Sequence, residues 1–92
     1  MPALHRLSAT QLKGLPPGKH CDGGGLWFHK RGDGGAQWVF RFKLHGPRRH
    51  MGLGGYPTVS LKRARELATV AREKVAGGTD PLEQRRRERR QE

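Results

Sequence analysis

Cysteine and long apolar runs are almost absent from this sequence. The one cysteine, Cys21, excludes a disulfide within the chain and fits a reducing compartment. No apolar run approaches the length of a transmembrane helix, and the first ten residues lack the apolar stretch of a signal peptide. We therefore expect a cytoplasmic protein that is neither secreted nor inserted in a membrane.

Acidic residues are also scarce. Eight Asp and Glu stand against nineteen Lys and Arg, which gives a net charge of +11 with neutral histidines, and Arg outnumbers Lys by thirteen to six. A field this positive attracts polyanions, and Arg binds phosphate and the guanine edge through two hydrogen bonds. The candidate partners are DNA, RNA and anionic membranes.

Hydrophobic residues make up 33% of the 92 residues, so the core must be small and one domain is expected. Fourteen glycines and six prolines indicate many turns. Ser8, followed three residues later by Gln11, is typical of the start of a short helix, which Gly14 and the Pro16-Pro17-Gly18 run would end.

Three segments have the pattern of antiparallel strands joined by short loops. In the middle one, Trp38, Phe40 and Phe42 point to one side, and Arg41 and Lys43 point to the other. The glycine-rich segments 22–25 and 32–35 are expected to be turns. The predicted strands are 26–30, 37–44 and 48–53.

One long helix is predicted over residues 61–76, with Ser60 as its N-cap and Gly77 at its end. Its apolar residues recur at helical spacing, and the resulting stripe can cover the apolar side of the sheet. The expected fold class is α+β, a three-stranded antiparallel sheet packed on one main C-terminal helix with a short N-terminal helical turn. The expected core consists of Trp38, Phe40, Phe42, Met51, Leu67 and Ala71.

The other side of the predicted sheet carries cations and no acidic residue. A surface selected only for solubility usually mixes both signs. A ribbon of strands fits the DNA major groove, where Arg can read guanine and Gln can read adenine. Trp27 has two interpretations, a DNA contact or a position partly buried under the N-terminal segment. The residues expected to bind DNA are Trp27, His29, Arg31, Gln37, Arg41, Lys43, Arg48 and His50.

No pattern of catalytic or metal-binding residues is evident. Asp22, Asp33 and Asp80 lie at expected turns, where Asp caps backbone groups, and Cys21 has no evident base partner. The sequence has neither a CxxC pair nor two histidines four apart on a helix, and its glycine-rich segments lack the Walker pattern. We expect no catalytic residue, metal or cofactor in this chain.

The C-terminal segment is strongly basic, with five Arg around one Glu between positions 85 and 90. Asp80 as N-cap, Pro81 at the first helical position and Glu83 as capping-box partner predict a further helix. Leu82 is its only evident apolar anchor, so we interpret residues 80–92 as a basic linker helix that follows a domain of residues 1–79. The linker contacts phosphate or is simply solvated.

Several motifs in fixed order resemble the amino-terminal domain of phage and genomic-island tyrosine integrases. They are a DGxGL turn at 22–26, a W-x-F-R-F strand at 38–42, M-x-L-G-x-Y-P at 51–57 and S-L-x-x-A-R at 60–65. The resemblance covers roughly residues 7–87. Departures are modest: Trp27 stands where the family often has Tyr, and His29 and His50 stand where other polar residues are common.

The resemblance implies an arm-type DNA-binding domain that places its sheet in the major groove of attachment sites during integration and excision. The parent would be a tyrosine recombinase whose catalytic residues lie in a later core-binding and catalytic region, so this chain is not itself an enzyme. Tyr56 does not match the motif of the family's nucleophile. Implied partners are double-stranded DNA at arm-type sites, other integrase protomers and accessory DNA-bending proteins, in association with the bacterial nucleoid.

Two alternatives remain beside this interpretation. The first is a stand-alone nucleic-acid-binding regulator or RNA-binding module, since the same charge would serve it. The second is a protein-interaction or membrane-surface module that uses the Arg-rich tail.

Overall fold

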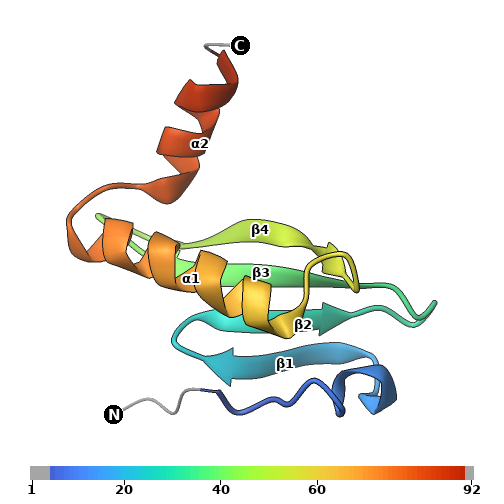
Figure 1. Cartoon of the computed structure of the whole chain (residues 1–92). Helices are drawn as coiled ribbons and strands as arrows, with labels where there is room; N and C mark the ends of the chain where they lie inside the picture. Colours follow the sequence, from blue (N-terminus) through green and yellow to red (C-terminus); the bar gives the residue numbers. More distant parts are fainter. Residues whose placement is uncertain (1–4, 91–92) are drawn as a thin grey trace.

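The computed structural model describes residues 5–90; residues 1–4 and 91–92, at the outer ends of the two expected segments 1–79 and 80–92, lie outside the described residues. An antiparallel β-sheet forms one layer, and a long helix covers one side of it (Figure 1). The elements are, in order, η1 (Leu12–Gly14), β1 (Gly18–Gly23), β2 (Leu26–Lys30), β3 (Ala36–Lys43), β4 (Arg48–Tyr56), α1 (Leu61–Ala76) and α2 (Pro81–Arg90).

The sheet has four antiparallel strands in the order β1-β2-β3-β4, so the prediction of three strands is wrong. The missed strand is β1, which pairs with β2 through registers such as Lys19 with His29 and Cys21 with Trp27. Its residues, Gly-Lys-His-Cys-Asp-Gly, lack the apolar alternation that reveals a strand. Backbone hydrogen bonds to β2 hold this edge strand in place. Such pairing cannot be predicted from the strand propensity of the residues or from their apolar pattern.

The β1–β2 turn is shorter than predicted, because Asp22 and Gly23 end the strand and only Gly24 and Gly25 form the turn. Gly25 has a positive φ of 91°, and a Cβ there would lie 2.7 Å from the carbonyl oxygen of Arg41. The backbone of this turn therefore packs directly against β3, and the amide of Arg41 donates to the carbonyl of Gly25 at 2.8 Å.

Helix α1 has the predicted bounds and the predicted cap. The hydroxyl of Ser60 accepts a hydrogen bond from the amide of Arg63 at 3.1 Å. Ala64, Ala68 and Ala71 are buried where α1 meets the sheet, and their small side chains let the helix approach closely. Leu67, predicted in the core, is only half-buried at its margin.

The core lies between α1 and one side of the sheet. Trp38 and Phe28 are completely buried, and their ring centroids lie 4.7 Å apart. The predicted core residues Phe40, Phe42 and Met51 are buried in the same layer. The alternation of β3 therefore places its aromatic residues inside, as the sequence predicts.

The N-terminal segment contains a single 3-10 turn, η1, at the place where the sequence predicts a short helical turn. The side-chain oxygen of Gln11 accepts from the amide of Ser8 at 2.9 Å, which is one half of the predicted capping box. Leu12 is buried in the core, so this segment closes one edge of the molecule.

Asp22 is buried at the end of β1, whereas the sequence predicted a turn residue that caps backbone groups. Its carboxylate accepts two hydrogen bonds from the guanidinium of Arg65 on α1, each 2.9 Å, and a third from the amide of Leu7 at 2.9 Å. Burial raises the pKa of Asp22, but these hydrogen bonds and the charge of Arg65 lower it more, so the pKa lies below the ordinary aspartate value. This pair ties β1, α1 and the N-terminal segment together.

We expect Asp22→Asn to lower the free energy of unfolding by about 2 kcal/mol at neutral pH, because a charged hydrogen-bond network loses its anion. The unfolded chain takes up the proton first as pH falls, because its Asp22 pKa is the higher one. The difference between wild type and variant should therefore be full well above about pH 4 and fade below it. Urea unfolding at neutral and acidic pH measures this, with Glu73→Gln on the exposed side of α1 as control. A difference that grows at acidic pH would contradict it.

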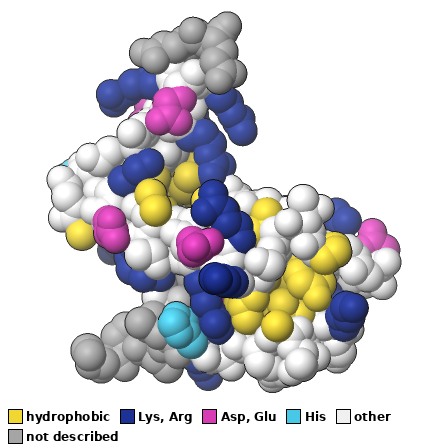
Figure 2. Space-filling model, in the orientation of Figure 1, with side chains coloured by type: hydrophobic (Ala, Val, Ile, Leu, Met, Phe, Trp, Pro, Cys, Tyr) yellow, Lys and Arg dark blue, Asp and Glu magenta, His cyan; other side chains and the backbone are white. Residues whose placement is uncertain are grey.

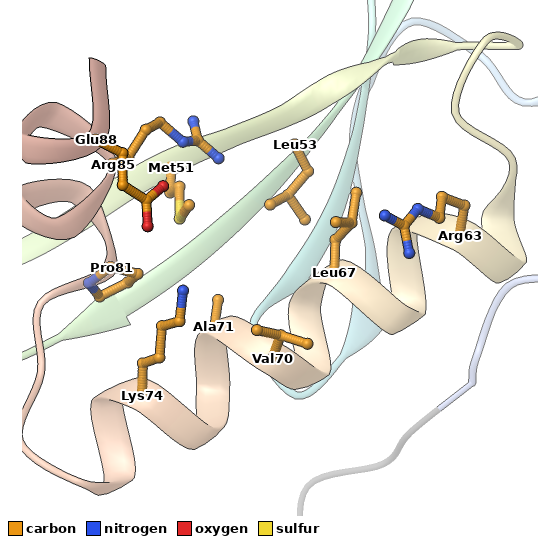
Figure 3. A pocket seen from close by; sticks show the side chains of 10 residues that line it. All are labelled: Met51, Leu53, Arg63, Leu67, Val70, Ala71, Lys74, Pro81, Arg85 and Glu88. Atoms are coloured by element: carbon orange, nitrogen blue, oxygen red, sulfur yellow. The ribbon is translucent and has the colours of Figure 1, made fainter. Parts of the chain in front are cut away.

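Helix α2 begins as predicted, with Asp80 accepting from the amides of Leu82 and Glu83 at 2.9 and 3.3 Å. It is more firmly attached than its single apolar anchor suggested. Pro81 is fully buried, and Asp80 forms an ion pair with Arg49 of β4. Figure 3 shows Pro81 facing α1 and Arg85 reaching towards β4, where it donates to the carbonyl of Gly52 at 2.8 Å.

Candidate nucleic-acid interface

The side of the sheet that faces away from α1 is called here the outer face. Strand registers bring its side chains into rows, for example Arg41 beside His50 and Lys43 beside Arg48. Most of these side chains are exposed or half-buried, while the alternate residues of the same strands are buried under α1. The outer face carries Lys19, Cys21, Trp27, His29, Gln37, Val39, Arg41, Lys43, Arg48 and His50.

No acidic side chain occurs among these ten described residues of the outer face. The opposite side of the molecule is different, because Asp and Glu lie among Lys and Arg over α1 and α2 (Figure 2). There, Arg63 pairs with Glu66 and Arg86 pairs with Glu83. Positive charge is therefore partly offset by acidic side chains on the helical side and is not offset on the outer face.

Arg41 lies at the centre of the outer face and is held on two sides. Its guanidinium carbon lies 4.8 Å from the centre of the Trp27 ring, which is a cation–π contact. Its Nε donates to Nε2 of His50 at 3.2 Å, which joins β3 to β4 at this point. Both terminal nitrogens of Arg41 remain available for the two parallel hydrogen bonds that guanine accepts in the major groove.

Trp27 is half-buried, between the two extremes that the sequence left open. Its ring lines a groove together with Arg6 and Cys21, and Arg41 lies over it. Trp27 thus orients a cation at the surface instead of filling the core.

A like-charged pair stands at one end of the outer face. Lys43 on β3 is directly opposite Arg48 on β4, and both side chains are exposed. Like charges at directly opposed positions destabilise a sheet. This pair has no acidic neighbour on the outer face. Such an arrangement is expected of a surface that binds an anion, because the bound anion offsets the repulsion between the two cations.

The other end of the outer face is more polar. His29 and Gln37 are opposite each other on β2 and β3, and Lys19 of the missed strand extends this row beyond His29. Burial lowers the pKa of His29, and the positive charges of Lys19, His50 and Arg41 lower it further. His29 therefore adds little positive charge to the outer face at pH 7, and its Nε2 is buried with no hydrogen-bond partner among the described residues.

Arg31 does not fit the predicted arrangement, and Val39 differs from the other residues of the outer face. Arg31 lies in the β2–β3 loop, where its Nε is 3.4 Å from the carboxylate of Asp33, and the structure does not bring it together with the other cations. Val39 faces outward but is buried, at 5% exposure. Lys19 was missed because β1 was missed, and the residues of β1 have no apolar alternation that would have revealed it.

The remaining chemistry of the chain is sparse. Within residues 5–90, no group of three His, Cys, Asp or Glu side chains is placed to hold a metal ion. In the same described part, no helix is long and apolar enough to cross a membrane. A cavity of about 420 Å³ between α1, α2 and β4 is lined by Leu67, Val70 and Pro81 and rimmed by charged side chains (Figure 3). It opens on the helical side, away from the outer face.

Comparisons with known proteins show which family the chain belongs to. Residues 7–88 match the family described as the Arm DNA-binding domain. The chain is 33% identical over 66 residues to an integrase of Shigella phage Sf6 and to the prophage integrase IntS of Escherichia coli K12, covering 72% of this chain and 17% of each relative. It is 37% identical over 65 residues to the prophage integrase IntZ of E. coli K12, covering 71% of this chain and 16% of that protein.

The chain thus spans about a sixth of the length of the curated relatives it matches. The family match covers every strand, α1 and most of α2, so it includes all residues of the outer face. On this evidence, the chain belongs to the Arm DNA-binding domain family.

Proposed function

We propose that the outer face binds the major groove of arm-type attachment sites and so anchors a recombinase on its DNA. Membership of the Arm DNA-binding domain family makes DNA the partner, in the context of integration and recombination. The observation that carries the proposal is the acid-free outer face, with Arg41 held ready at its centre. Pre-positioning matters because less side-chain entropy is lost when the contact forms.

The chemistry of the outer face suits the major groove better than the minor groove. Arg reads guanine by two hydrogen bonds to N7 and O6, and Gln reads adenine by two to N6 and N7, and these patterns occur only in the major groove. Arg41 and Gln37 are on the same side of the same strand. We assign base contacts to these two and phosphate contacts to Lys43 and Arg48 at the exposed end.

The whole protein is proposed to be a tyrosine recombinase whose catalytic residues lie outside this chain. The relatives named integrases are about six times longer than the matched segment. In this proposal residues 80–92 lead from the domain of residues 1–79 towards the core-binding and catalytic region. Other integrase protomers and accessory DNA-bending proteins would be its partners at the attachment site.

The two tryptophans provide an internal test of the proposed face. Trp27 lies on the outer face, whereas the indole N–H of Trp38 is in the core and donates to the carbonyl of Val59 at 2.7 Å. The full chain, labelled with ¹⁵N, would be titrated with the duplex that selection from a random pool recovers as the tightest binder. We expect the indole signal of Trp27 to move and that of Trp38 to stay.

A matched RNA duplex serves as the competitor. Its major groove is deep and narrow, so it should not displace the selected DNA at equal concentration. If the Trp27 signal does not move while the protein is bound, the outer face is not the interface. If the RNA duplex competes equally, the alternative of an RNA-binding module is favoured.

A further inference from the structure

A groove of about 610 Å³ opens where the outer face ends at the β1–β2 turn. The glycine run 23–25 and Trp27 form part of its lining. Four arginines line it, Arg6, Arg41, Arg48 and Arg72. Two of these belong to the outer face, but Arg6 and Arg72 come from elsewhere and were not among the predicted binding residues.

Arg72 reaches this groove from the opposite layer of the fold. It stands on α1, whose C-terminal half lies at the same end of the sheet as the β1–β2 turn (Figure 1). Its Nε donates to the carbonyl of Gly24 at 2.9 Å, which fixes the side chain beside the turn. Its terminal nitrogens are left to bind a ligand.

Arg6 approaches from the N-terminal segment. Its amide donates to the carbonyl of Asp22 at 2.9 Å, so the backbone at this position is held against the end of β1. The side chain itself is exposed. Arg6 and Arg72 therefore extend the positive charge of the outer face past the edge of the sheet.

The charge of this groove is not compensated. Among the described residues that line it there is no Asp or Glu. The carboxylate of Asp22 is the acidic group nearest in sequence to the turn, and it is buried and bound to Arg65. Several arginines elsewhere have acidic partners, as Arg31 has Asp33 and Arg49 has Asp80. Four guanidinium groups around one groove are best explained by an anionic ligand.

The width of the sheet, compared with the width of the DNA major groove, indicates that the anion is a backbone phosphate. Four strands at about 4.8 Å spacing span about 14 Å, whereas the major groove is about 12 Å wide. Along the strands the sheet is longer still. When the centre of the outer face meets the bases, its rim must therefore meet the phosphate walls of the groove.

We propose that the groove of Arg6 and Arg72 binds a backbone phosphodiester of the DNA that the outer face reads. This inference rests on the proposed function and adds a sequence-independent clamp to it. A phosphate in the groove fixes the register of the domain on the duplex, while Arg41 reads a base. The same contact links α1, the layer that does not face the DNA, to the backbone.

The test compares Arg6→Ala and Arg72→Gln with Arg63→Gln in the full chain. Arg63 is also on α1, but it lines the cavity of Figure 3 on the other flank, and its removal changes the net charge equally. Each groove variant should bind roughly tenfold more weakly, by the same factor on the selected duplex and on a scrambled duplex. Each should also reduce the log–log salt slope by about 0.9. Arg63→Gln should change affinity and slope little.

Each outcome is decisive. Unchanged affinity and slope in Arg6→Ala and Arg72→Gln overturn the phosphate groove, while binding by the wild type keeps the proposed function. A loss on the selected duplex alone shows base reading and overturns the phosphate assignment. Absence of duplex binding by the wild type overturns the proposed function itself. If thermal unfolding shows that Arg72→Gln is destabilised, the exposed Arg6 decides the test.

Discussion

Trp38→Ala is expected to lower the free energy of unfolding by about 3–5 kcal/mol, the cost of emptying a large aromatic site in a core. Trp38 has no exposed surface, contacts the ring of Phe28 and lies 6.4 Å from that of Tyr56. Its removal also leaves the carbonyl of Val59 without its indole donor. Because the total stability of such a domain is about 5–15 kcal/mol, a large share is lost.

Denaturant unfolding followed by circular dichroism measures this loss. Val70→Ala is the matched control, since Val70 is 50% exposed on α1 and its truncation should cost less than about 0.5 kcal/mol. A Trp38→Ala protein that remains as stable as wild type but no longer binds DNA would show that the two sides of the sheet had been exchanged. The buried and outer faces would then have to be reassigned.

Much of the fold follows from local patterns in the sequence. The alternation of β3 separates Phe40 from Arg41, and Ser60 with the spacing of the alanines sets the start and the buried stripe of α1. These features are readable because each residue's side is fixed by its own element. The bounds of β2 and α1 are therefore predicted correctly.

Long-range features could not be read in this way. Strand β1 has no apolar alternation and exists through its pairing with β2. The partner of Asp22 is 43 residues away on α1, so no local pattern indicates that this aspartate is buried. The docking of α2 depends in part on an ion pair between Arg49 and Asp80 that only the tertiary structure brings together.

The candidate site also combines features that local patterns predict with features that depend on long-range contacts. The acid-free rows of β3 and β4 could be predicted, because alternation alone places them. The contacts of Arg41 with Trp27 and His50 could not, since they depend on the register between three strands. The groove of Arg6 and Arg72 was hidden for the same reason, as its arginines come from four separate parts of the chain.

Arg41→Ala is expected to weaken binding to the selected duplex by about 1–3 kcal/mol, because it removes a two-pronged contact to a base. Arg41→Lys keeps the charge but cannot donate two parallel hydrogen bonds to one base. This variant should therefore show a reduced preference for the selected duplex over a scrambled one. Arg63→Ala on α1 removes the same charge away from the outer face and should have little effect. Affinities would be measured by fluorescence anisotropy at one fixed salt concentration.

The central claim, that the outer face reads bases in the major groove, is tested most directly by a double-mutant cycle between protein and DNA. Replacing guanine by 7-deazaguanine removes the N7 acceptor from the major groove only. At the guanine where this replacement weakens wild-type binding most, Arg41→Ala should cause little further loss, because both changes remove the same contact. Additive losses at every guanine of the selected duplex would contradict the account.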